Sequence, residues 1–412
     1  MGLEWQLAWR NVWRNSRRTA LTVAATVFAV FLVVVFVAMA AGVHGKMIED
    51  SVRMHSGHLE VSGKGYLQNR TLDQYVRLRP AVVNALDAQH ELAGWAPRVD
   101  GFALISKDSA TQGVIVLGVD PRREASVSSL ASRVEKGAFL PSGVKRGIVL
   151  GGRLARNIGA RLGDELLLYS VAYSQEMAYE LFTVTGILKL PELELDRRLS
   201  VISLRDAQDF FVYGNRVSEI ALLATSADGL PALRDRILHA LPQDEKAPIE
   251  VHLWNEVMPE LEQFIFLDDA GMYIMLVILV VVVAFGILNT LLMSVLERTR
   301  ELGVLLALGL RPIAIFRVVY LESLMLAVVG LAIGLAVALP TVLYMQGHPI
   351  PLGGDLAQAT AWLGIEPIMT FKLKPLNPLG SVLTILSVAV IAALYPALKA
   401  SRARPVDALR SL

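Results

Sequence analysis

Four stretches of the chain stay apolar for long enough to cross a lipid bilayer, which takes about 20 residues of helix. The predicted membrane spans are residues 19–43, 270–296, 312–345 and 378–398. Only Arg317 and Glu322 interrupt the third run, and both stand near its start. The first run is longer than the apolar segment of a cleaved signal peptide, so we expect it to remain as a membrane helix.

Residues 44–269, between the first two spans, follow a different pattern. Short runs rich in β-forming residues predict strands at 58–61, 113–119, 147–150, 165–169, 182–188, 199–203 and 219–223. Helices are predicted at 80–92, 152–159 and 230–241, with stalk helices leading to the first two spans. Interleaved strands and helices are typical of an α+β domain. The predicted fold class is thus an α-helical membrane protein with four transmembrane helices and a large α+β extracytoplasmic domain.

The first 18 residues carry a stripe of tryptophans. Trp5, Trp9 and Trp13 follow one another at i, i+4 spacing, which places them on one side of a helix. The arginines Arg10, Arg14, Arg17 and Arg18 lie largely off that stripe. Because tryptophan favours the headgroup region and arginine favours anionic lipid, residues 1–18 are predicted to form an interfacial helix. The alternative is that the tryptophans pack against the membrane spans.

Residues 297–311, between the second and third spans, combine a charged patch with a short apolar run. About seven apolar residues cannot cross a membrane, so a short amphipathic helix exposed to the cytosol is predicted. Exposed Leu302, Leu305, Leu306 and Leu308 would need a partner to cover them, although an inert connector is the alternative. The candidate coupling residues are Glu297, Arg298, Thr299, Arg300, Glu301, Leu302, Gly303, Leu305, Leu306, Ala307, Leu308 and Gly309.

The formal net charge of +1 is a sum of unlike parts. Residues 44–269 hold 25 Lys and Arg against 31 Asp and Glu, whereas the rest of the chain holds 14 against 7. Basic residues gather before the first span, in 297–311 and in the tail 399–412, while the loop 346–377 carries only Lys372 and Lys374. Since basic flanks stay cytoplasmic, both termini are predicted inside, and the large domain and the loop 346–377 outside.

Composition supports a membrane protein and excludes several other classes. Hydrophobic residues make up 54% of the chain and charged residues 19%, which excludes intrinsic disorder. With no cysteine, disulfides and thiolate metal sites are excluded. No nucleotide-binding glycine loop and no catalytic motif occur, so the chain is predicted not to be an enzyme. His55 and His58 form the one local histidine pair, interpreted as a polar junction rather than a metal site.

Glu322 is the one deep carboxylate in the predicted spans. An ionisable group inside a membrane is a functional candidate, although pairing with Arg317 or Tyr320 is an equal alternative. Small residues follow it in the same span, and they allow close approach of another helix. They are Gly330, Ala332, Gly334 and Ala336.

The segment NTLLMSVLERTRELGVLLALG resembles the signature around the coupling helix of FtsX/MacB-like ABC transporter permeases, which are of the mechanotransmission type. The matching residues are Asn289, Glu297, Arg298, Thr299, Glu301, Gly303, Ala307 and Gly309. Glu322, Gly330 and Gly334 resemble the family's glutamate followed by spaced glycines. The tail resembles the usual family ending at Pro396, Ala397, Ala400, Pro405, Ala408 and Leu409.

Other segments are similar to the branch of lipoprotein-releasing permeases and to the periplasmic core of the family. They are WRNVWRNSRRT, SGHLEVSGKGY, GVDP, GIVLGGRLARNIGARLGDEL and FTVTGIL. Two features depart from the family. Leu306 stands where a basic residue is frequent, and the hairpin YSVAYSQEMAYELFTV is short and lacks the proline of the hook loop that this branch can carry. The fused ATPase domain of macrolide-efflux relatives does not occur in this sequence.

The resemblance implies a permease subunit in a bacterial inner membrane. Two copies of a separate ABC ATPase would bind ATP and Mg, so this chain would hold no cofactor itself. The first span would suit the seam of a homo- or heterodimeric permease pair. A periplasmic adaptor or carrier and membrane lipids are further implied partners, and nucleic acid is not. The acidic outer domain and the lack of a polar pore favour a lipoprotein, lipid or other amphipathic cargo.

The alternative is a mechanotransmission regulator that transports nothing and controls a periplasmic partner such as a cell-wall hydrolase. Cell-division members of the superfamily work in this way, but their outer domain is smaller.

Overall fold

The structure is a computed structural model that describes residue 10 and residues 16–54, 56–242, 247–355, 357, 368–373 and 376–402. The predictions for Trp5, Trp9, Trp13 and His55, and for the tail beyond Arg402, lie outside the described residues. The side chain of Arg18 lies outside them as well.

The chain divides into two compact units, each described here by itself. The helical unit comprises the residues up to Gly45, Ile265–Pro351 and the residues from Ile368 onward. The strand-rich unit comprises Lys46–Phe264 and a short stretch that begins at Leu352.

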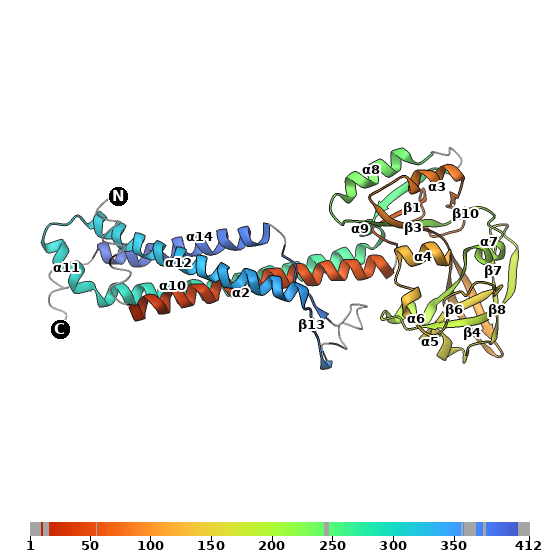
Figure 1. Ribbon diagram of the computed structural model, residues 1–412, viewed down its shortest axis with the longest axis horizontal. Coiled ribbons are helices and arrows are strands. Elements are labelled where there is room, and N and C mark those ends of the chain that lie inside the picture. The colour runs from red at the N-terminus through yellow and green to blue at the C-terminus, as the bar shows by residue number, and fades with distance from the viewer. Residues whose placement is uncertain are drawn as a thin grey trace. The chain divides into compact units, whose positions relative to one another are not determined.

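Long helices dominate the helical unit (Figure 1). Its elements are α2 (Ser16–Met54), α10 (Pro259–Glu297), α11 (Thr299–Ala307), α12 (Pro312–Gly347), β13 (Ile350–Pro351), β14 (Ile368–Met369) and α14 (Leu376–Ser401). Helices α2 and α10 each extend past the boundary into residues of the strand-rich unit, in the segments where stalk helices are predicted. Four helices are long and apolar enough to cross a membrane among the described residues, in agreement with the four predicted runs.

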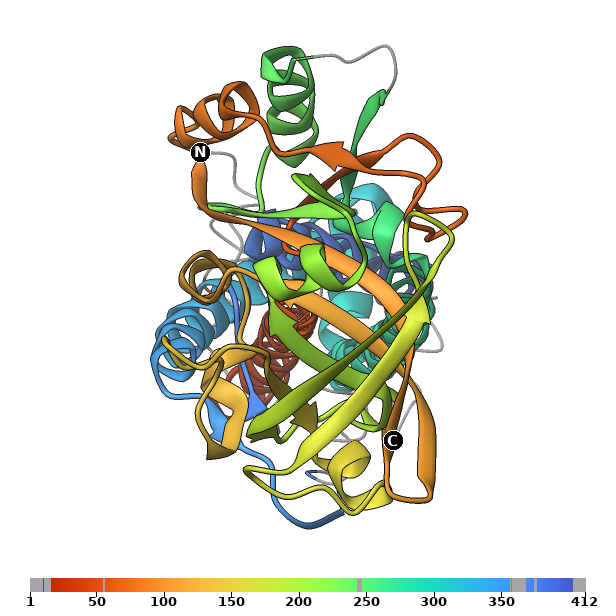
Figure 2. The same cartoon turned by 90° about the vertical axis from the view of Figure 1, so that its right-hand side faces the viewer.

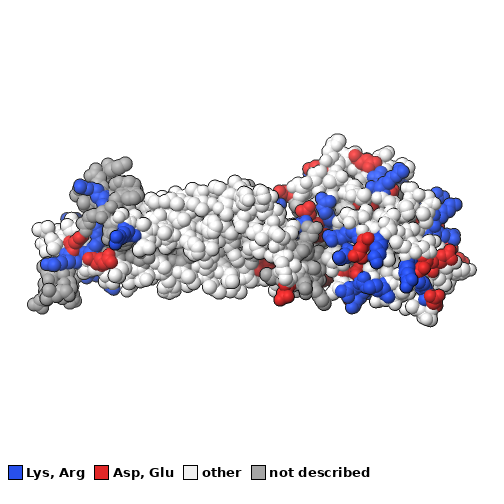
Figure 3. Space-filling model, turned by 60° about the horizontal axis from the view of Figure 1, so that its bottom comes forward, with Lys and Arg blue, Asp and Glu red and all other residues white. Residues whose placement is uncertain are grey.

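Charge is distributed unevenly over the helical unit. Figure 3 shows a face on which the middle of the long helices carries no charged side chain, whereas charged side chains gather at the end where α11 lies. Such a charge-free surface can face lipid, because no ionised group has to leave water.

Two buried glycines bring α12 against α2. A Cβ atom at Gly330 would stand 2.6 Å from the Cβ of Thr26, and one at Gly334 would stand 2.6 Å from the Cβ of Val30. Real carbon atoms do not approach so closely, so only glycine permits this helix spacing. The predicted packing role of Gly330 and Gly334 is confirmed. Ala332 and Ala336 are exposed and take no part in this contact with α2.

The strand-rich unit mixes strands and short helices, as the sequence predicts. Its strands are β1 (Leu59–Gly63), β2 (Val76–Arg77), β3 (Leu92–Lys107), β4 (Ala110–Val119), β5 (Val134–Gly137), β6 (Gly147–Gly151), β7 (Glu165–Val171), β8 (Met177–Leu188), β9 (Leu199–Ser203), β10 (Arg216–Val217), β11 (Glu219–Ala224) and β12 (Ile249–Leu253). Its helices are α3 (Pro80–Asp87), α4 (Pro121–Val127), a 3₁₀ turn (Ala131–Arg133), α5 (Gly152–Asn157), α6 (Leu193–Arg198), α7 (Leu204–Phe210), α8 (Leu230–Ala240) and α9 (Trp254–Val257).

Six of these strands close into a ring. Strand β3 pairs with β4, β4 with β9, β9 with β6, β6 with β8, β8 with β7, and β7 again with β3. The other side of β3 belongs to an open sheet, because β11 pairs with β3, β1 with β11 and β12 with β1. Figure 2 looks onto the strands of this unit. The 16-residue β3 is thus shared by the ring and the open sheet.

All seven predicted strands are found, and two predictions about this unit were wrong. The helix predicted at 80–92 ends at Asp87, and the chain has entered β3 by Leu92. The sequence did not predict β3 itself, because Pro97 and Gly101 interrupt its alternation of apolar residues.

Candidate functional site

Helix α11 occupies the segment in which the coupling residues are predicted. Arg298 interrupts the helical conformation between α10 and α11, with φ −105° and ψ 10°. Gly309 ends α11 in the left-handed region, at φ 90°. The Leu310 N–H donates to the Leu305 carbonyl and the Gly309 N–H to the Leu306 carbonyl, a Schellman motif that satisfies the last carbonyls of the helix. Pro312 then starts α12, as predicted.

The Arg298 side chain turns inward, toward α12. Its Nη1 atom donates to both carboxylate oxygens of Glu322, each at 3.0 Å, and Glu322 is 5% exposed. The Nε atom of Arg298 also lies 3.5 Å from Glu301 Oε2. Buried ion pairs persist where geometry and hydrogen bonds offset the loss of hydration. The sequence suggested Arg317 or Tyr320 as the partner of Glu322, but the structure places Arg298 there, 24 residues upstream.

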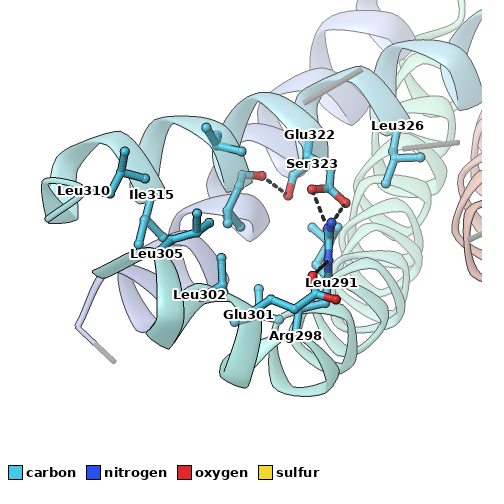
Figure 4. Close-up of a pocket in the computed structure, with 13 residues that line it drawn as sticks. Leu291, Arg298, Glu301, Leu302, Leu305, Leu310, Ile315, Glu322, Ser323 and Leu326 are labelled. Carbon is cyan, nitrogen blue, oxygen red and sulfur yellow. Dashed lines mark hydrogen bonds and ion pairs between the residues drawn. The ribbon is translucent and has the colours of Figure 1, made fainter. Parts of the chain in front are cut away.

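A cavity of about 200 Å³ lies beside this ion pair, between α10, α11 and α12 (Figure 4). Apolar side chains form most of its wall, and Arg298, Glu301, Glu322 and Ser323 are the polar residues along it. The ion pair therefore links the helix break at Arg298 to the first third of α12, and so fixes the position of α11 against α12.

The leucines of α11 divide into two groups. Leu302 and Leu306 are half-buried and pack on a cluster that includes Val295 and Ile315, so the prediction that they are exposed was wrong. Leu305 and Leu308 are 42% and 79% exposed, as predicted. Val304, which the sequence analysis did not select, is also 41% exposed. One face of α11 thus anchors the helix, and the other presents apolar side chains to solvent.

The other predicted coupling residues surround this face. Glu297, Arg300, Ala307 and Gly309 are exposed, and Gly303 is buried. The Thr299 hydroxyl donates to the carbonyls of Leu296 and Val295, 2.8 and 3.2 Å away, and so serves the turn between α10 and α11.

Two further predicted residues lie apart from the ion pair. Asn289 is exposed on α10, and Arg17 is exposed near the start of α2. Among the residues that the structure describes, no group of three or more His, Cys, Asp or Glu side chains could hold a metal ion. His58 is buried, and its Nδ1 accepts a hydrogen bond from the Ala224 N–H.

The sequence matches two family profiles that together cover most of the chain. Residues 19–240 match the MacB-like periplasmic core domain, and residues 273–405 match the FtsX-like permease C-terminal region. The chain therefore belongs to the FtsX/MacB-like family of ABC transporter permeases, and the resemblance described above is confirmed.

Two of the similar relatives match over most of their length, and a third matches over a short part of it. The chain is 24% identical over 374 residues to the lipoprotein-releasing system transmembrane protein LolC of Neisseria meningitidis, which is 86% of this chain and 84% of that protein. It is 25% identical over 338 residues to LolE of Haemophilus influenzae, or 79% of each chain. The macrolide export ATP-binding/permease protein MacB of Rhodopirellula baltica is 34% identical over 127 residues, 30% of this chain and 16% of that protein.

Proposed function

We propose that this chain is the membrane subunit of an ABC transporter that couples ATP hydrolysis by a separate ATPase subunit to movement of the strand-rich unit. The observation that carries the proposal is the anchored helix α11, which presents Val304, Leu305 and Leu308 to solvent. Exposed apolar side chains on a helix that is fixed by a buried ion pair are suited to receive a partner. ATP and Mg would be held by that partner, and this chain would be a transport subunit rather than an enzyme.

The proposed location is a bacterial inner membrane. The four apolar helices would span it, and the basic flanks would place both termini and α11 in the cytoplasm. The strand-rich unit would then lie in the periplasm.

A substitution at Leu308 tests the proposed ATPase contact. Leu308→Asp places a charge on the most exposed leucine of α11 without touching the Arg298–Glu322 pair. We expect co-purification of the ATPase to fall about tenfold or more, as at an interface hot spot. Leu162→Asp is the matched control, because Leu162 is 45% exposed in the strand-rich unit. Equal ATPase recovery from Leu308→Asp and the control would overturn the assignment of α11.

A permease partner would cover α10. None of the residues in the most apolar stretch of α10 is buried within the described chain, against 39% for α2. The first span is predicted at the seam between two permease chains. The difference in burial favours α10 as the helix that contributes more surface to this seam. Since the chain has no cysteine, single introduced cysteines give clean cross-linking.

Val282→Cys on α10 is expected to form a disulfide-linked pair in membranes, whereas Val337→Cys on α12 is not. The two valines are 63% and 47% exposed. The mass of the product separates a pair of identical chains from a mixed pair. A link at Val337→Cys alone would place the seam on α12.

The proposed cargo is a lipoprotein, lipid or other amphipathic molecule, as the names of the relatives LolC and LolE suggest. The strand-rich unit offers an exposed apolar face on β3, β7 and β8 that a cargo, adaptor or carrier could contact. Cross-strand neighbours on this face include Leu167 with Leu181 and Val171 with Met177, and the most exposed residue is Tyr179, at 74%. Apolar pairs of this kind are usually buried, so this face is suited to a partner.

The cargo proposal is tested with the permease and its ATPase in nanodiscs that contain a lipoprotein. We expect ATPase activity to respond to the lipoprotein, and the lipoprotein to be released in an ATP-dependent way. ATPase activity that no lipoprotein or lipid changes would favour the alternative, a force-transmitting regulator of a periplasmic enzyme.

A further inference from the structure

A second cavity, of about 300 Å³, lies inside the strand-rich unit. It is lined by the polar side of strands β1, β3 and β11, opposite the apolar core, and by residues around the end of α2 and α9. Glu194 and Arg198 of α6 also line it, and both are exposed, so the cavity reaches the surface of the unit.

Negative charge exceeds positive charge in the lining. The acidic residues are Glu60, Asp100, Glu192, Glu194 and Glu219, and the basic residues are Arg70, Arg98 and Arg198. The described lining therefore carries two more carboxylates than guanidinium groups. Glu194 and Arg198 are exposed to water, whereas a carboxylate in the buried part of the cavity is unfavourable unless a proton or a cation balances it.

The buried guanidinium of the lining is already shared between two acids. Arg98 is 2% exposed and donates to Glu124 from Nε and Nη2, at 3.1 and 2.6 Å. Its Nη1 lies 3.3 Å from Glu219 Oε1. Asp100 accepts from the Tyr66 hydroxyl at 3.4 Å and lies 3.8 Å from Arg70 Nη1 through the same oxygen, Oδ2.

Glu60 is left without such a donor. It stands on β1, is 0% exposed and lines the cavity. No N–H group or hydroxyl of the described residues donates to either of its carboxylate oxygens, and the same holds for Asp100 Oδ1. Ser56 Oγ also lacks a partner among the described residues. The side-chain neighbour within hydrogen-bond reach of Glu60 is another acid, Glu219, with which it can share a proton. Buried polar atoms without partners are rare, so a group of them along one cavity indicates a ligand that would supply donors.

We propose that this cavity binds an organic ammonium group, with Glu60 and Asp100 as the acceptors of its N–H donors. A bare metal ion does not fit, because no three acidic or histidine side chains of the described chain converge closely enough to hold one. Apolar residues face the acids across the cavity, among them Met54, Leu130, Leu195 and Met258. A short aliphatic chain attached to the ammonium would lie against that wall.

Proton binding supports this choice and offers a second readout. Burial raises the pKa of Glu60 well above its usual range, and the neighbouring Glu219 raises it further. Burial, with Glu219 again, raises the pKa of Asp100 to about 7. A cation in the cavity must displace these protons, so its affinity increases with pH while the amine stays charged. The charged and titratable groups around the two acids are Tyr66, Arg70, Arg98, Glu124, Glu192, Glu194, Arg198 and Glu219.

The test is calorimetric titration of n-butylammonium into the full chain in nanodiscs at pH 6 and pH 8, with 1-butanol as the neutral control. Wild-type chain is expected to bind the ammonium saturably, more tightly at pH 8, and to ignore the alcohol. Glu60→Gln is expected to weaken binding about tenfold or more, the usual effect of losing a hydrogen bond to a charged group. Because glutamine has the shape of a protonated glutamate and burial favours that neutral form of Glu60, the variant is expected to remain folded. Glu165→Gln, at an exposed position on β7, is the matched control and should bind as wild type does.

Three outcomes would overturn the proposal. The first is equal binding of ammonium and alcohol, and the second is unchanged affinity in Glu60→Gln. The third is an absence of ammonium binding at pH 8. That last result would mean that the cluster holds protons alone.

Discussion

Both units of the molecule bury a glutamate, and the two carboxylates have different surroundings. In the helical unit Glu322 is 5% exposed and receives two hydrogen bonds from Arg298 (Figure 4). In the strand-rich unit Glu60 is 0% exposed and receives none from the described residues. A charge in the apolar surroundings of α12 is unfavourable without partners, and Arg298 supplies Glu322 with two hydrogen bonds. The cavity beside Glu60 leaves room for a group from outside the chain.

Glu322 therefore has a structural role inside the chain, whereas Glu60 is available to bind a ligand. Arg298 donates two hydrogen bonds to Glu322. The role of this ion pair is to position α11, so that its exposed leucines are accessible to a partner. Glu60 receives no hydrogen bond from a basic group of the described residues, and its burial as an ionised carboxylate is unfavourable. A buried titratable group beside a cavity is a candidate for a ligand site.

Removing Arg298 tests the structural role of the Arg298–Glu322 pair and should have the largest effect on the free energy of unfolding. Arg298→Met leaves Glu322 buried without its donor, which costs about 3–5 kcal/mol of unfolding free energy. Thermal unfolding of the purified chain measures it. The double variant with Glu322→Met is expected to recover most of the loss. If Arg298→Met alone unfolds like the wild type, the pair does not anchor α11.

The close approach of α12 to α2 gives the next largest effect. Gly334→Val places a side chain where a Cβ already meets Val30 at 2.6 Å, so the helices must separate, at about 1–3 kcal/mol. Gly380→Val on α14 is the control, because no atom lies within 4 Å of a Cβ there. Equal unfolding temperatures for the two variants would mean that α2 and α12 are not in tight contact.

The pH dependence of stability tests the other half of the comparison. The pKa of Glu60 and of Asp100 is higher in the folded than in the unfolded chain, and that of Asp100 is about 7. Their protonated forms therefore favour the folded state at low pH, and this stability is lost as pH rises from about 4 through 7. The loss per group is about 1.4 kcal/mol for each pH unit.

Unfolding temperatures of wild type and Glu60→Gln between pH 5 and pH 8 measure this loss. The variant is expected to lose less stability than the wild type as the pH rises. Parallel curves for the two chains would show that Glu60 is not held protonated.

The smallest effect on stability is expected at the exposed face of β3, β7 and β8. Tyr179→Ser removes a ring that is 74% exposed, so unfolding free energy should change by less than about 0.5 kcal/mol. Cargo release in nanodiscs should nevertheless fall if this face contacts the cargo or its carrier. If Tyr179→Ser were destabilised as much as Gly334→Val, the Tyr179 ring would contribute to the stability of the fold rather than to a contact with cargo.

Local pattern was sufficient to predict most of the elements. The apolar runs predicted the four long helices, and the β-rich runs predicted seven strands of the strand-rich unit. The local pattern failed to predict a strand where residues that disfavour strands are held in a sheet by pairing with distant strands. Strand β3 contains Pro97 and Gly101 and still extends over 16 residues, because β4, β7 and β11 all pair with it.

The sequence predicted which segment of the chain holds the candidate site, but not how the side chains of that site are arranged. Residues 297–309 were selected correctly as a short helix between two spans, and Gly309 ends it. Which leucines face solvent, and which arginine meets Glu322, depends on how α10, α11 and α12 pack against one another. The unpaired Glu60 was not anticipated at all, since a glutamate in an alternating strand is expected to face water.

One feature of the sheet bears on how such a protein can be assembled. The first long strand of the unit, β1, and its last strand, β12, pair along five residues. Paired strands lie about 4.8 Å apart, so the segment 57–258 begins and ends at nearly the same place in the sheet. A domain with adjoining ends can be inserted between two helices, or excised from between them, without rearranging its own sheet. We therefore expect residues 57–258 to fold as an independent domain when they are expressed alone.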